Sequence, residues 1–92
     1  MTEQELLAAT EQVTYHLYQN REQEAVAQMA ELLPVYQQMI QTMLVERNDT
    51  GAIIYLNMLK ELIENYRAQD MLGMADCLSE YAAQMIEHYC RG

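Results

Sequence analysis

Four side chains of this 92-residue sequence are the ones whose types most readily do chemistry: His16, Cys77, His88 and Cys90. A di-iron site in a helical bundle would need a Glu-x-x-His motif on facing helices. Val13 and Met85 stand three residues before the two histidines, so the di-iron interpretation fails.

Zinc binding and cysteine–histidine catalysis find equally little support. His88 and Cys90 are two residues apart in sequence, which places them about 200° apart around a helix. A tetrahedral zinc site needs four ligands, and these cysteines and histidines have no recognisable zinc spacing. Catalysis would need His16 and Cys77 in contact. Phosphate-loop, serine-hydrolase and calcium-loop motifs are also absent. We therefore predict no catalytic, cofactor-binding or metal-ligating residue, and no enzyme.

The charge balance narrows the choice of partners. The chain has 14 acidic against 5 basic residues, a formal net charge of −9. Such a surface repels phosphate, so neither nucleic acid nor an anionic membrane is an expected partner, whereas a basic protein would be attracted. The start, MTEQELLAAT, lacks the features of a signal peptide, and no apolar run reaches the roughly 20 residues of a membrane span. Two cysteines do not make a disulfide framework. We expect a cytoplasmic protein with reduced thiols.

The elements that would position these side chains are helices. Half of the residues (51%) are hydrophobic, with only 3 Gly and 1 Pro, and good helix formers dominate. Apolar residues recur with helical period over about 3–19, 22–46, 51–67 and 71–89, and no stretch alternates with period two. Short connections favour antiparallel packing. We predict one all-α domain over residues 1–92, an antiparallel four-helix bundle of two hairpins, about 3–46 and 51–90.

Two of the three breaks between the helices are clear. In RNDTG, residues 47–51, Asn48 can end a helix in the left-handed conformation, and Asp49 or Thr50 can cap the next one. In RAQDML, residues 67–72, Asp70 is the candidate N-cap.

The remaining break, near Asn20, is weaker. Asn20 with Gln23 resembles a capping box, but a continuous helix is the alternative. Pro34 falls inside the second helix, on the side away from the apolar stripe, and should bend that helix around the core.

A similar phrase occurs twice: MAELLPVY at residues 29–36 and MADCLSEY at residues 74–81, 45 residues apart. This favours a duplicated helical hairpin, and the alternative is that two amphipathic helices of similar composition match by chance.

Two further features could serve binding. The 8 methionines either fill the core or line an adaptable peptide groove. Leu7 and Tyr18 lie together on the outer side of the first helix, with Tyr15 further round, and Val35 and Ile54 also point outward. Leu7 and Tyr18 are therefore the candidate partner contact. The alternative is that they only cover neighbouring loops.

The stretch MLKELIENYRAQDMLGMADCLSEYAAQMI, residues 58–86, resembles a small uncharacterised all-helical family of Gram-positive bacteria. The pattern is a leucine-rich helix, an acidic turn, and a second helix with Ala-Asp-x-Leu and a tyrosine. It falls on Asp70, Ala75, Asp76, Leu78 and Tyr81. The resemblance implies a soluble helical bundle without catalytic residues. In shape and charge the chain is also similar to flagellar export chaperones.

These observations support three hypotheses about function. The first is a non-enzymatic protein-binding module, an adaptor or chaperone-like bundle. The second is a structural homo-oligomer whose exposed apolar residues pair with themselves. The third is a metal or small-molecule site inside the bundle core.

Overall fold

The computed structural model describes all residues from 1 to 92 and contains four α-helices and no strand. They are α1 (Glu3–Tyr18), α2 (Glu22–Gln41), α3 (Ile53–Arg67) and α4 (Met71–Arg91). A π-helical turn, η1 (Thr42–Glu46), continues α2, and a 3-10 turn, η2 (Thr50–Ala52), leads into α3. The all-α prediction and the four helical spans are confirmed, because 3.6-residue periodicity is strong in long amphipathic segments.

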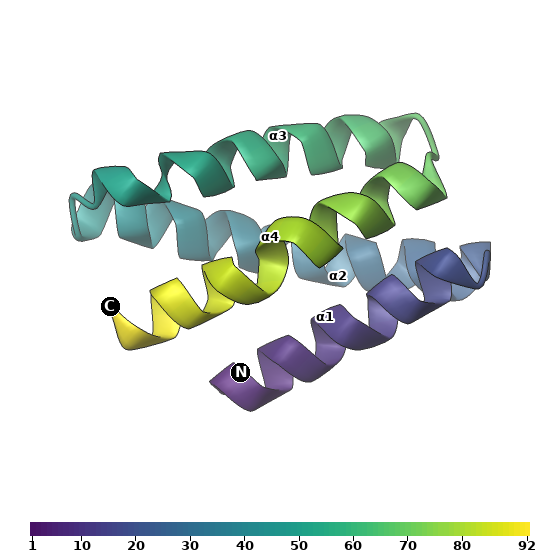
Figure 1. Cartoon of the computed structure of the whole chain (residues 1–92), viewed down its shortest axis with the longest axis horizontal. Coiled ribbons are helices and arrows are strands. Elements are labelled where there is room, and N and C mark those ends of the chain that lie inside the picture. The colour runs from purple at the N-terminus through teal and green to yellow at the C-terminus, as the bar shows by residue number, and fades with distance from the viewer.

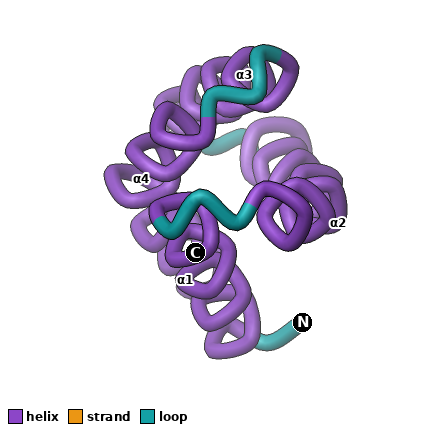
Figure 2. The backbone as a smooth tube through the Cα atoms, turned by 90° about the vertical axis from the view of Figure 1, so that its right-hand side faces the viewer, coloured by secondary structure: helices purple, strands orange, loops and turns teal.

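The four helices form a ring around one core, each antiparallel to its neighbour in sequence (Figures 1 and 2). Helix α1 packs against α2 and α4, and α3 packs against α4 and α2. The most extensive of these contacts joins α1 to α4, the first and last helices of the chain. The bundle measures 37 × 25 × 19 Å. None of its helices has the length and apolar character needed to span a bilayer.

The core is a single cluster of 23 buried apolar side chains drawn from all four helices. Seven of the 8 methionines belong to it, and only Met1 is exposed. Flexible, polarizable methionines fill irregular interior space well. Core filling is therefore the role that the structure gives them. Of the residues expected to point outward, Ile54 and Pro34 are exposed, but Val35 is half-buried against the core.

Three residues with positive φ end helices: Asn20 (57°), Asn48 (52°) and Gln69 (57°). At Asn20 the chain turns by a Schellman arrangement, in which the Arg21 backbone N–H donates to the His16 carbonyl at 3.0 Å. The break near Asn20 and the left-handed Asn48 are thereby confirmed. The capping box of Asn20 with Gln23 is wrong, because Asn20 ends α1 instead and α2 has no side-chain cap.

The caps of the second hairpin agree with expectation. The carboxylate of Asp49 accepts a hydrogen bond from the Gly51 N–H, and that of Asp70 accepts one from the Gly73 N–H, both at 2.9 Å. A capping box that we did not predict opens α1, where Thr2 and Glu5 bond reciprocally.

The turns of the two hairpins have the same backbone pattern, because Arg21 N–H donates to the His16 carbonyl and Asp70 N–H donates to the Asn65 carbonyl. Their spacing differs from that of the repeated phrase. The equivalent turn residues, Asn20 and Gln69, are 49 residues apart, whereas the phrases at Met29 and Met74 are 45 residues apart. A difference of four residues is about one helical turn. The phrase therefore lies on the buried side of both α2 and α4, but in α4 it begins one helical turn closer to the preceding turn residue.

Candidate protein-binding groove between α1 and α4

A groove of about 600 Å³ runs along the surface between α1 and α4, and it is larger than the other surface hollows described below. Its lining combines apolar side chains with hydroxyls and one acid: Leu7, Thr10, Glu11, Thr14, Tyr15, Tyr18, Leu78, Ser79 and Ala83. Smaller grooves of about 350 and 290 Å³ lie beside α2, one at Met1, Leu6 and Pro34 and one at Ile40, Leu44 and Leu56.

The groove follows from the residues that the two helices offer each other. Leu7, Thr14 and Tyr18 recur at intervals of seven and four, which places them on one flank of α1. This flank lies beside the buried ridge of α1 and faces α4. The opposing flank of α4 carries the small residues Ser79 and Ala83, whose short side chains leave the space between the helices unfilled.

Both residues of the candidate partner contact line this groove. Leu7 is half-buried and packs against the core. Tyr18 is 49% exposed, and its hydroxyl donates a hydrogen bond to Asp76 Oδ1 at 3.0 Å and lies 3.1 Å from Ser79 Oγ. The two side chains therefore have intramolecular contacts with the core and α4. The apolar pattern of α1 alone did not indicate these contacts. Their contact with a partner stays a prediction.

The polar groups inside the groove already have partners. Thr14 Oγ1 donates to the Thr10 carbonyl at 2.7 Å. The Thr10 hydroxyl lies 2.6 Å from the hydroxyl of Tyr36 on α2, a buried contact. Burial raises the pKa of Tyr36 to about 12. With these hydroxyls satisfied, the inner surface of the groove behaves as an apolar one.

Acidic side chains border the groove. Glu11 is part of its lining, and none of the nine lining residues is basic. Asp76, Glu80 and Glu87 are exposed on α4 at spacings of four and seven, on the side that also carries Ala83. The charge of Glu80 raises the pKa of Tyr81, which reflects the negative potential along this helix.

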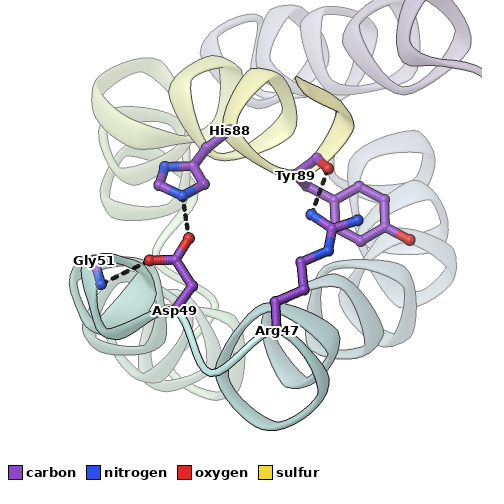
Figure 3. A network of polar contacts seen from close by, with 5 residues as sticks. All are labelled: Arg47, Asp49, Gly51, His88 and Tyr89. Atoms are coloured by element: carbon purple, nitrogen blue, oxygen red, sulfur yellow. Dashed lines mark hydrogen bonds and ion pairs between the residues drawn. The ribbon is translucent and has the colours of Figure 1, made fainter. Parts of the chain in front are cut away.

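A second polar cluster ties the loop after η1 to the end of α4 (Figure 3). His88 Nε2 lies 2.5 Å from Asp49 Oδ2, and its ring packs edge-on against Tyr55 with centroids 5.6 Å apart. Arg47 donates to the Tyr89 carbonyl at 2.7 Å, and its guanidinium lies 4.8 Å from the centre of the Tyr89 ring. The hydrogen bond from His88 lowers the pKa of Asp49.

This cluster has the acid–imidazole part of a catalytic triad without a nucleophile. The hydrogen bond that His88 makes through its side chain goes to Asp49, and neither cysteine bonds to it. A triad needs a hydroxyl or thiol within hydrogen-bond reach of the imidazole. The arrangement therefore fastens the loop to α4, a role that no local sequence signal indicates because the two residues are 39 positions apart.

The other chemistry-bearing residues face different helices. His16 Nδ1 lies 2.8 Å from Gln28 Oε1 on α2. Cys77 is buried, and its thiol points to the Met58 carbonyl of α3 at 3.6 Å. Cys90 is exposed. No three His, Cys, Asp or Glu side chains gather as a metal site would require.

Comparison with known proteins adds no relative: no family model, curated protein or solved structure matches the chain. The fold and the groove define an all-α four-helix bundle with an open apolar groove on one side. The resemblance of residues 58–86 to a Gram-positive family, and the similarity to flagellar export chaperones, stay predictions.

Proposed function

We propose that this chain is a non-enzymatic protein-binding module, an adaptor or chaperone-like bundle, and that its α1/α4 groove receives the partner. The observation that carries this proposal is that Leu7 and Tyr18 line one open groove with Leu78 at its base. Tyrosines are enriched at the centres of protein interfaces, where a few side chains supply most of the affinity. The free thiols of Cys77 and Cys90 favour a cytoplasmic location.

A structural homo-oligomer is the second candidate. It is favoured by large apolar side chains that stand exposed outside the groove, among them Val45, Ile53 and Leu72. Pairing of two copies through the α1/α4 groove itself would bring two acid-bordered surfaces together, and like charges in close contact oppose association. A metal or small-molecule site in the core has less support, since one apolar cluster fills the interior.

The groove can be tested by blocking it. Ala83 is exposed and lines the groove, whereas Ala27 is exposed on α2 away from it. Ala83→Arg should abolish capture of a native partner, and Ala27→Arg, which adds the same charge and bulk, should retain it. The bound proteins are compared by quantitative mass spectrometry after immobilising each variant, and circular dichroism checks that both fold.

Equal capture of the partner by the two variants would show that the partner does not bind in the α1/α4 groove. Sedimentation of the wild-type chain tests the second candidate function, the structural homo-oligomer. A monomer contradicts the homo-oligomer, and a stable oligomer that survives Ala83→Arg supports self-association through another face.

A further inference from the structure

We infer that the occupant of the α1/α4 groove is a basic amphipathic α-helix of another protein, with apolar side chains toward the groove and Lys or Arg along its flanks. This inference rests on the protein-binding function proposed above and names the chemical class of the partner.

The walls of the groove select a helix. Both walls are α-helices, whose backbone N–H and C=O groups are bonded within each helix, so they offer no open edge to which a strand could add. Recognition must pass through side chains. From Leu7 to Tyr18 the groove advances 11 positions along α1, roughly 16 Å at the helical rise, which matches about three turns of a bound helix. Apolar residues at i, i+3 or i+4 and i+7 of that helix would face the groove.

The inner surface of the groove favours apolar anchors. Leu78 lies at its base with 2% of its surface exposed, and Leu7 and Ala83 lie on its two sides. The Thr10 and Thr14 hydroxyls are already bonded within the bundle. An apolar side chain entering the groove therefore displaces water without leaving a polar group unpaired.

Two tyrosines, Tyr15 and Tyr18, line one end of the groove. The bonds of the Tyr18 hydroxyl to Asp76 and Ser79 hold its ring in place before any partner arrives, which reduces the entropy lost on binding. Tyr15 is 55% exposed. Exposed tyrosine faces attract Lys and Arg side chains.

The acidic residues that border the groove favour basic residues on the flanks of the bound helix. Glu11 stands on the α1 side, and Asp76, Glu80 and Glu87 stand on the α4 side. Long Lys and Arg side chains can cover apolar surface with their stems and reach these carboxylates with their charged ends. A second copy of this acidic chain, nucleic acid and an anionic membrane would each meet repulsion here, so a basic helix is the occupant that fits.

The experiment uses synthetic helical peptides of roughly 14 residues, or four turns. The first carries Leu and Ala on one face and Lys and Arg on the flanks. A second peptide replaces the basic residues with Glu, and a third scrambles the first. Binding of each peptide to the full chain is measured by isothermal titration calorimetry at low and physiological salt. The first peptide should bind, and the acidic and scrambled peptides should not.

A matched pair of triple variants separates groove recognition from general attraction to an acidic protein. One variant combines Glu11→Gln, Glu80→Gln and Glu87→Gln beside the groove. The other replaces three exposed acids elsewhere, Glu24, Glu46 and Glu64, in the same way. Both carry a net charge of −6 instead of −9. The groove variant should lose about tenfold in affinity, and the other should change by less than about twofold.

The outcomes distinguish the two proposals. Equal losses in both triple variants, or binding of the acidic peptide, would overturn the basic helix as occupant. If no peptide binds while Ala83→Arg still loses its native partner, the occupant is wrong and the protein-binding function stands. If Ala83→Arg loses no partner and no peptide binds, both fall. Formation of a dimer that Ala83→Arg disrupts would show that a second copy fills the groove and would overturn the inference.

Discussion

His88 Nε2 lies 2.5 Å from Asp49 Oδ2 and so joins the end of α4 to the loop between η1 and η2. The contact spans 39 residues of sequence. Asp49 lies between the π-helical turn η1 and the start of α3, in the connection that joins the two hairpins. The contact therefore fixes this connection against α4. The stability of that join should depend on the ionisation of the carboxylate.

Asp49→Asn tests the charge of this carboxylate while preserving a cap for Gly51. The folded state lowers the pKa of Asp49, so its stabilising contribution is present at neutral pH and is lost as the pH falls below about 4, the unfolded value. Asp49→Asn should therefore be less stable than wild type in urea denaturation at neutral pH, and the difference should shrink as the pH falls through the lowered pKa of Asp49. Asp70→Asn, at a cap without a histidine, is the control and should show a smaller loss at neutral pH. A pH-independent loss in Asp49→Asn would contradict this account.

The buried hydroxyl pair of Thr10 and Tyr36 predicts strong coupling between two substitutions. Tyr36→Phe leaves the Thr10 hydroxyl without its partner at 2.6 Å and should cost about 1–2 kcal/mol. Thr10→Val should cost a similar amount for the same reason. The double variant removes both polar groups, so its loss should be clearly smaller than the sum of the two. Chemical denaturation of all four proteins measures this cycle, and additive losses would show that the hydroxyls do not interact.

Leu78 and Leu72 offer a matched comparison on α4, because Leu78 is 2% exposed and Leu72 is 61% exposed. Leu78→Ala should cost about 2–5 kcal/mol through lost burial and the cavity that remains. Leu72→Ala should change the free energy of unfolding by less than about 0.5 kcal/mol. Denaturation curves of the two variants provide the measurement. A cost for Leu78→Ala below about 1 kcal/mol would mean that the base of the groove is not part of the packed core.

The two cysteines should differ sharply in reactivity. Burial, with smaller contributions from nearby carboxylates, raises the pKa of Cys77 to about 11, so its reactive thiolate is scarce at neutral pH. Cys90 is exposed. A thiol reagent such as Ellman's should react rapidly with one equivalent per folded chain and with a second only after unfolding. In Cys90→Ser the rapid phase should disappear, and two rapid equivalents in the wild type would contradict the burial of Cys77.

The helical spans were predictable from sequence because each helix repeats its apolar side chains with the same period over many residues. Leu59 of α3 and Leu78 of α4, which belong to these apolar repeats, are both buried. The sequence alone does not decide whether α1 ends at Asn20, since local signals do not separate a helix-ending asparagine from a capping one. In the folded chain Asn20 has a positive φ and ends α1.

The groove was only partly predictable. The pattern of α1 identified Leu7 and Tyr18 as lying off its apolar stripe. A single helix, however, does not reveal which flank its neighbours will cover. The hydrogen bond from Tyr18 to Asp76 joins residues 58 positions apart. The pairing of Asp49 with His88 has the same origin, because both contacts depend on how the hairpins pack together.

The contact between α1 and α4, the most extensive in the bundle, links the two ends of the chain. Glu3 Oε1 and Arg91 Nε lie 3.5 Å apart. A circularly permuted chain, joined by a short linker from Gly92 to Met1 and opened at the turn after Tyr18, would convert this long-range contact into a local hairpin. Lower contact order favours faster folding. The permuted chain would also carry both walls of the groove in one continuous helical hairpin.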